Sequence, residues 1–259
     1  MARTTLETQL QQIRAKIVAL GSLVETALKQ ALQAVQSGDQ ALCGLVIAGD
    51  NAIDTIRSEI ERLAFQSLTL QQPLIETDIR FLSCAPAMGG DLERMGDNAA
   101  GIAKLLLRIV PLRLRETNQE SGDHLKCIQH HKTGRIDQHV TEASIVTGLV
   151  ELGQEAQRVL QGTLHAFVQN DTQAARVIWQ EDDVVDVRYH LVRHDIMTML
   201  TDIHAIPALR QDALAMQRMT YWLWIAHNLE RISDHCTNIC ERIVFFLEGE
   251  GNIQPKEPI

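Results

Sequence analysis

Two stretches of the sequence are nearly alike: LERMGD at residues 92–97 and LERISD at residues 229–234. The second lies 137 positions after the first, and other acidic and apolar positions recur 132 positions later. The matched aspartates are Asp39, Asp50 and Asp54 with Asp171, Asp182 and Asp186, and the matched apolar residues are Leu28, Leu32 and Val35 with Leu160, Leu164 and Phe167. Recurrence of both kinds of position predicts one structural unit that occurs twice, with about five residues added inside the second repeat.

Apolar residues recur every three to four positions around these stretches, which indicates amphipathic helices. The pattern predicts helices over residues 4–36, 40–69 and 73–109 in the first repeat, and over 141–169, 171–201 and 207–248 in the second. Pro73 and Pro207 are expected to open the third helix of each repeat, because proline is tolerated at the first helical position. Pro86 is expected to kink the third helix shortly before Glu93, and Pro111 is expected to end it.

Three long helices joined by tight turns form an antiparallel bundle. We therefore expect an all-α fold of two tandem, pseudo-symmetric antiparallel three-helix bundles, at residues 1–111 and 141–248. Residues 112–140 lose the helical pattern and contain Gly, Asn and four His, so they are predicted to form a linker. Residues 249–259 are predicted to be a flexible tail.

The bulk composition agrees with a helical fold and narrows the function. The 259 residues are 45% hydrophobic but only 4% aromatic, whereas strand-rich domains usually contain more aromatic residues. A formal net charge of -9 argues against nucleic acid as the main partner. The sequence shows no signal peptide, no apolar run long enough to span a membrane and no CxxC pair, which favours a cytoplasmic protein with reduced thiols.

The acidic residues of the two repeats stand in pairs four positions apart. Residues at this spacing lie on one face of a helix, where like charges repel each other. A bound cation would offset that repulsion, and carboxylates suit Mg, Mn, Fe or Zn ions. The sequence therefore predicts metal sites at Glu93 and Asp97 and at Glu230 and Asp234, with Asp50 and Asp54 and with Asp182 and Asp186 added from the neighbouring helices.

Two other interpretations of the acidic pairs stay open. A solvated acidic face with no metal would make the chain a purely structural helical adaptor. A carboxylate-bridged di-iron oxidase is also built from helix bundles, but it needs Glu-x-x-His on two helices. No Glu in this sequence has a His three residues later, and no GxGxxG, Walker or GxSxG motif occurs.

Two segments of the chain resemble the PhoU family, which regulates bacterial phosphate signalling. They are residues 71–97, with QQP, DIR and DLERMGD, and residues 224–239, WIAHNLERISDHCTNI. The resemblance implies a cytoplasmic, non-enzymatic adaptor of two three-helix bundles whose acidic motifs bind divalent or ferric ions. It also implies a negative regulator, commonly a homodimer, that restrains the Pst phosphate transporter through its ATPase subunit and holds the sensor kinase PhoR in its repressing state. Such a protein would reach the membrane only through these partners.

The two motifs depart from the family pattern in different ways. The Asn that usually follows the motif aspartate by four residues is kept as Asn238, but Gly101 replaces it in the first repeat. Ser233 replaces a Gly that is kept as Gly96. With the kink expected at Pro86, the loss of this Asn makes the first-repeat acidic site the poorer match to the family pattern, and Glu230 and Asp234 the better one.

Several remaining residues admit both a structural and a functional interpretation. His235 is either a packing residue or a further ligand. The aromatic cluster of the last helix is either core or a partner-binding patch, because aromatic residues are enriched at interfaces. The features in question are His124, His130, His131 and His139 of the linker, His190 and His194, and the aromatic residues Tyr221, Trp222 and Trp224.

Overall fold

The computed structural model describes residues 2–70, 74–118, 140–205 and 213–249. These residues form six long helices, and no strand occurs among them. The helices are α1 (Ala2–Ser37), α2 (Gln40–Leu70), α3 (Glu76–Asn118), α4 (Glu142–Gln169), α5 (Thr172–Ala205) and α6 (Ala213–Glu248). The predicted all-α class is confirmed.

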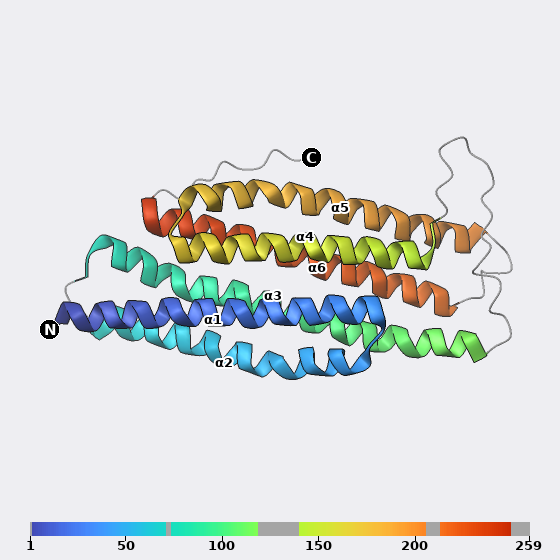
Figure 1. Ribbon diagram of the computed structural model, residues 1–259, viewed down its shortest axis with the longest axis horizontal. Coiled ribbons are helices and arrows are strands. Elements are labelled where there is room, and N and C mark those ends of the chain that lie inside the picture. The colour runs from blue at the N-terminus through green and yellow to red at the C-terminus, as the bar shows by residue number, and fades with distance from the viewer. Residues whose placement is uncertain (1, 71–73, 119–139, 206–212, 250–259) are drawn as a thin grey trace.

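The helices form two three-helix bundles that lie side by side (Figure 1). Helices α1, α2 and α3 contact one another, as do α4, α5 and α6. Between the bundles, α3 packs on α6 and α1 packs on α4. In the described parts of the chain α2 and α5 contact only their own bundles, and Figure 1 shows them on opposite outer sides of the molecule. The predicted pair of bundles is confirmed.

Equivalent turns separate the first two helices of each repeat. Gly38 and Asn170, which are 132 positions apart, both adopt positive φ values of 72° and 52°. The aspartate that follows each of them caps the next helix: Asp39 Oδ1 accepts from Ala41 N at 2.8 Å, and Asp171 Oδ1 accepts from Ala174 N at 2.9 Å. A left-handed residue followed by an acidic cap therefore builds both turns.

The end of α3 differs from the sequence prediction. The helix does not stop at Pro111 but continues to Asn118, past the boundary predicted at residue 111. It also stays helical through Pro86. Each proline removes one backbone donor, and burial of neighbouring side chains offsets that loss. Ala85 and Met88 are fully buried, and Leu112 is nearly so.

Some predicted features lie outside the described residues. These are Pro73, Pro207, the linker from 119 to 139 with its four histidines and Cys127, and the tail from 250. The other four cysteines are buried free thiols, as predicted: Cys43, Cys84, Cys236 and Cys240.

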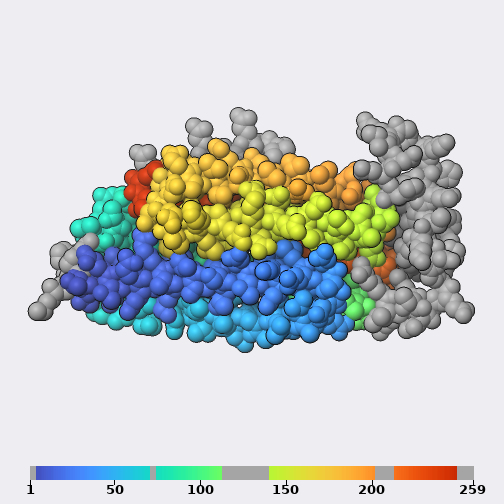
Figure 2. Space-filling view, viewed as in Figure 1, coloured from blue at the N-terminus to red at the C-terminus, as the bar shows by residue number. Residues whose placement is uncertain are grey.

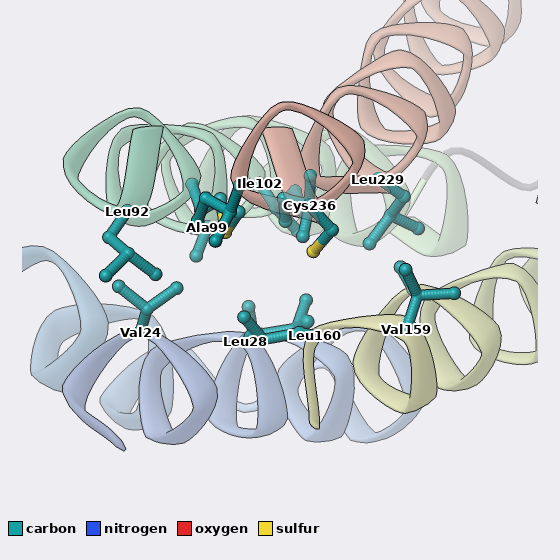
Figure 3. Packing of buried hydrophobic residues seen from close by; sticks show 14 of the residues in the cluster. Val24, Leu28, Leu92, Ala99, Ile102, Val159, Leu160, Leu229 and Cys236 are labelled. Atoms are coloured by element: carbon teal, nitrogen blue, oxygen red, sulfur yellow. The ribbon is translucent and has the colours of Figure 1, made fainter. Parts of the chain in front are cut away.

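The core is continuous between the two repeats. Figure 3 shows apolar side chains of α1, α3, α4 and α6 directed into one shared interior, among them Val24, Ala99, Val159 and Cys236. The contact between α1 and α4 is itself symmetric, because each helix offers a glycine to a leucine of the other. A Cβ at Gly21 would overlap the side chain of Leu164, and a Cβ at Gly153 would overlap the side chain of Leu32.

Gly21 and Gly153 are related by the repeat, as are Leu32 and Leu164. Each glycine thus receives the leucine of the other repeat, so the two bundles interlock. Figure 2 shows α1 and α4 lying against each other along the displayed face. Within the described ranges, no helix carries an apolar stretch long enough to cross a bilayer.

Candidate metal centres

The first-repeat acidic cluster consists of Asp50 and Asp54 on α2 with Glu93 and Asp97 on α3. A close approach of the two helices places the pairs next to each other. A Cβ at Gly96 would lie 2.7 Å from Ile53 Cδ1, so only a glycine fits without displacing the isoleucine. Ile53 stands between the aspartates of α2, and Gly96 precedes Asp97, so this contact lies at the level of the cluster.

The four carboxylates act on one another electrostatically. Burial and the charge of Asp97 raise the pKa of Asp50, and Asp54 adds to the effect. Burial, Asp97 and Asp54 likewise raise the pKa of Glu93. Three nearby cations oppose these shifts without cancelling them: Lys104 at Asp50, and Arg57 and Arg94 at Glu93. Because these carboxylates raise one another's pKa values, a cation bound between them would be favourable.

The second-repeat acidic cluster consists of Asp186 on α5 with Glu230 and Asp234 on α6. Burial raises the pKa of Glu230, and the charges of Asp234 and Asp186 raise it further, while His227 lowers it. The His227 Nδ1 atom lies 3.1 Å from Glu230 Oε2. That oxygen is buried, and no donor among the described residues is aligned for a hydrogen bond to it. A buried carboxylate oxygen without a donor is a suitable metal ligand.

Asp182 of α5 is buried, whereas Asp186 and Glu230 are half-buried. The Asp182 side chain is 3% exposed, and its charge acts on the buried thiols of Cys236 and Cys240. Burial is the main cause that raises the pKa of Cys236, and it raises the pKa of Cys240 to about 12. The charges that act on Glu230 are those of Asp234, His227 and Asp186. Asp182 thus differs in burial from its half-buried counterpart Asp50, and its role as a ligand stays a prediction.

The side chains of both clusters do not stand in a coordination geometry. In the parts of the chain that the structure describes, no three His, Cys, Asp or Glu side chains are arranged as the ligands of one ion. The carboxylates are close enough to perturb one another's pKa values, and their types fit a hard cation. Metal binding at these positions stays a prediction.

A buried polar network at the contact of α3 and α6 was not foreseen from the sequence. Asp91, 1% exposed, accepts from Arg242 through Oδ2 and from Asn238 Nδ2 at 3.5 Å through Oδ1. His235 Nδ1 lies 3.1 Å from the same Oδ1. The His235 side chain therefore points toward α3 of the first repeat and not toward the second-repeat acidic cluster, which contains its neighbour Asp234.

The same network explains the departure at Gly101. Gly101 and Asn238 are equivalent positions, as are Asp91 and Asn228. A Cβ at Gly101 would lie 3.2 Å from Asn228 Oδ1, so Gly101 faces α6. The difference between Gly101 and Asn238 therefore concerns the contact between the repeats, not the first-repeat acidic cluster. The sequence does carry one sign of this network: the residue before the acidic motif is Asp91 in the first repeat and Asn228 in the second, although the motifs themselves are nearly alike.

The aromatic residues of α6 divide between the interior and the surface. Trp222 is buried, and its Nε1 donates to Glu142 Oε1 at 2.9 Å, whereas Trp224 is 54% exposed. Tyr221 is half-buried, and His190 and His194 are exposed on α5. These residues do not form one patch.

The comparisons with known proteins agree with the repeat. The PhoU domain model matches residues 17–106 and 149–243, one segment in each bundle. The chain belongs to the PhoU family. A PhoU homolog of Caulobacter vibrioides is 30% identical over 242 residues, which cover 93% of this chain and 89% of that protein.

Other PhoU proteins match over a similar length. One from Streptococcus pneumoniae serotype 4 is 30% identical over 96% of this chain and 97% of its own, and the Escherichia coli K12 protein is 27% identical over 93% and 85%. All three are named as phosphate-specific transport system accessory proteins. The crystal structure of the PhoU regulatory protein from S. pneumoniae superposes with a TM-score of 0.70 at 28% identity, over 95% of this chain and 98% of that one.

Proposed function

We propose that this protein regulates phosphate uptake and phosphate-starvation signalling as an adaptor. It restrains the Pst transporter through its ATPase subunit and holds the sensor kinase PhoR in its repressing state when phosphate is plentiful. The observation that carries the proposal is the match of both repeats to the PhoU domain, with relatives along nearly the whole chain that are named as accessory proteins of phosphate transport. The protein acts in the cytoplasm, without catalysing a reaction, and as a homodimer.

The acidic clusters serve this function as metal sites. Asp50, Asp54, Glu93 and Asp97 would hold ions in the first repeat, and Asp186, Glu230 and Asp234 would do so in the second, with Asp182 nearby. A bound Mg, Mn, Fe or Zn ion would supply positive charge beyond that of nearby side chains such as Lys104 and Arg57. The chain's own contribution is the close α2–α3 approach at Gly96, which holds the carboxylates of two helices together.

Deletion of the gene in its host tests the regulatory role. Loss of an adaptor that maintains repression should release both the transporter genes and phosphate uptake in phosphate-rich medium, and a plasmid copy should restore repression. The measurement is phosphate uptake together with a reporter of the starvation response. Repression that persists in the deletion strain would show that the protein has another role.

Metal content tests the clusters separately. The double substitution Glu230→Gln, Asp234→Asn should remove the metal bound by the second repeat, as measured by elemental analysis of protein purified without chelator. The matched control is Glu151→Gln, Glu155→Gln on α4, an acidic pair at the same spacing that already binds Arg188. A protein that carries no metal at all would favour the purely structural adaptor.

A further inference from the structure

The outer face of α5 carries an exposed apolar seam. It consists of Val177 (52% exposed), Val184 (43%), Val187 (54%) and Leu191 (61%). Seven, three and four positions separate these residues, which is the heptad spacing of a helix that packs on another helix. Yet α5 contacts only α4 and α6 in the described chain, and its buried residues face them. Four large apolar side chains in one line on the solvent side are more than scattered surface residues.

The equivalent face of α2 shows that the fold does not require this seam. The positions 132 residues earlier are Leu45, Ala52, Thr55 and Glu59. Only Leu45 is a large apolar residue, and Glu59 binds Lys16 in an ion pair. Both helices occupy the same place in their bundles, so the seam is a property of the second repeat alone.

Charges beside the seam change sign along α5. Glu181, Asp183 and Asp186 accompany its first half, and Arg188 and Arg193 accompany its second half. Glu181 keeps 32% and Arg188 37% of the side chain exposed, although each also pairs with a residue of α4. A parallel pair of α5 helices in register would set each charge against its own copy, whereas an antiparallel pair can set Asp183 against Arg188.

At the two outer ends of the seam the order of the charges is reversed, with a basic residue at the beginning and an acidic residue at the end. Arg176 precedes Val177, and Asp195 follows His194. When Val184 of one helix faces Val187 of an antiparallel partner, the same register opposes Arg176 to Asp195 and Val177 to His194. The charge order of α5 is thus complementary to itself in one orientation only.

We propose that a second copy of this chain docks antiparallel along α5, with Val177, Val184, Val187 and Leu191 as the shared apolar seam. The arrangement is isologous, because each copy uses the same patch and a twofold axis passes near Val184 and Val187. This inference gives the surface of the homodimer in the proposed function and rests on it for the oligomeric state. The first repeat, including its acidic cluster, stays outside the interface.

Cysteine cross-linking tests both the surface and the orientation. Val177→Cys and His194→Cys are made separately in a Cys127→Ser background, and the other four cysteines are buried. Positions 177 and 194 are roughly 25 Å apart along one helix, which is too far for a disulfide to form within one chain. A disulfide between the two positions must therefore join two chains, and it reports how their α5 helices are aligned. A mixture of the two proteins should form the mixed disulfide under mild oxidation, while neither protein alone should cross-link.

Cross-linking of Val177→Cys with itself would indicate a parallel pair and overturn the proposal. A dimer that forms no disulfide in the mixture would place the interface elsewhere and overturn it as well. A wild-type protein that sediments as a monomer over a wide concentration series would do the same.

A substitution on the seam gives an independent measurement. Leu191→Glu should weaken dimerisation by about tenfold or more in sedimentation equilibrium, because a charge would replace an apolar side chain of the seam and be buried opposite Gln180 of the second copy. The matched control is Leu45→Glu, an equally exposed leucine (59%) on α2, which should leave the dimer unchanged. If both substitutions weaken the dimer equally, or if neither weakens it, the seam on α5 is not the dimer interface. Because this is measured with purified protein, failure of the phosphate-signalling role would leave its outcome unaffected.

Discussion

The two repeats place the same acidic motif at the same point of α3 and α6 but surround it differently. In the first repeat Gly96 packs against Ile53, and the four carboxylates of α2 and α3 are close enough to perturb one another's pKa values. In the second repeat Ser233 replaces Gly96, and Val185, smaller by one methylene, replaces Ile53. There Asp182 is buried, whereas its counterpart Asp50 is half-buried. The duplicated motif thus kept its carboxylates while the helix packing around it diverged.

The largest expected effect concerns the buried polar network around Asp91, at the contact of α3 and α6. Asp91→Ala should lower the free energy of unfolding by about 3 kcal/mol, because Arg242 and His235 would lose their buried acceptor. Asn228→Ala, at the equivalent place in the second repeat, should cost about 1 kcal/mol. Urea denaturation of both variants gives the comparison, and equal losses would mean that the network adds nothing.

The symmetric glycine contacts between α1 and α4 come next. Gly153→Ala should destabilise the protein by about 2 kcal/mol, because its Cβ would overlap Leu32. Gly44→Ala, on α2 where a Cβ meets nothing within 4 Å, should instead stabilise it by about 1 kcal/mol through helix propensity. Thermal unfolding distinguishes the two signs, and stabilisation by both substitutions would contradict the interlocked contact.

The packing difference beside the acidic motifs can be exchanged. Gly96→Ser should cost about 1 to 2 kcal/mol, because the new side chain would meet Ile53. Adding Ile53→Val, which reproduces the pair of the second repeat, should recover part of that loss. The test is a double-mutant cycle by chemical denaturation. Strict additivity of the two losses would show that these positions do not determine how closely the helices approach.

Much of this fold follows from the sequence, because helical periodicity and the 132-residue offset are local signals that survive without tertiary information. Asp39 and Asp171 were recognisable as equivalent positions for the same reason. The continuation of α3 past Pro111 was not, because burial of Leu112 offsets one lost hydrogen bond. The partners of Asp91 lie about 150 residues away on α6, and spacing within a helix carries no information on such a contact.

The acidic sites were predictable in part. The spacing of Glu93 and Asp97 places them on one face, but the difference between Asp50 and Asp182 depends on how each outer helix is rotated in its bundle. Sequence offset gives them the same position, whereas Asp182 is buried and Asp50 is half-buried.

The smallest effect is on pH dependence without metal. The folded protein holds the pKa of Glu93 above its usual 4.5, so this group favours folding below that pH and the advantage is lost as pH rises through the folded pKa. Glu93→Gln should therefore stabilise metal-free protein by a few tenths of a kcal/mol at neutral pH, since the side chain is partly exposed. Glu230→Gln should change stability in the same direction, because burial and the charge of Asp234 raise the pKa of that carboxyl. Unfolding curves at acidic and neutral pH measure the difference.

The most direct test of the account is a metal titration of four proteins by calorimetry: wild type, Glu93→Gln with Asp97→Asn, Glu230→Gln with Asp234→Asn, and the combination of all four substitutions. Each double variant should lose the metal binding of its own repeat, and the combination should bind no Mn or Zn. Undiminished binding by the combined variant would contradict the claim that the duplicated acidic motif is a metal site.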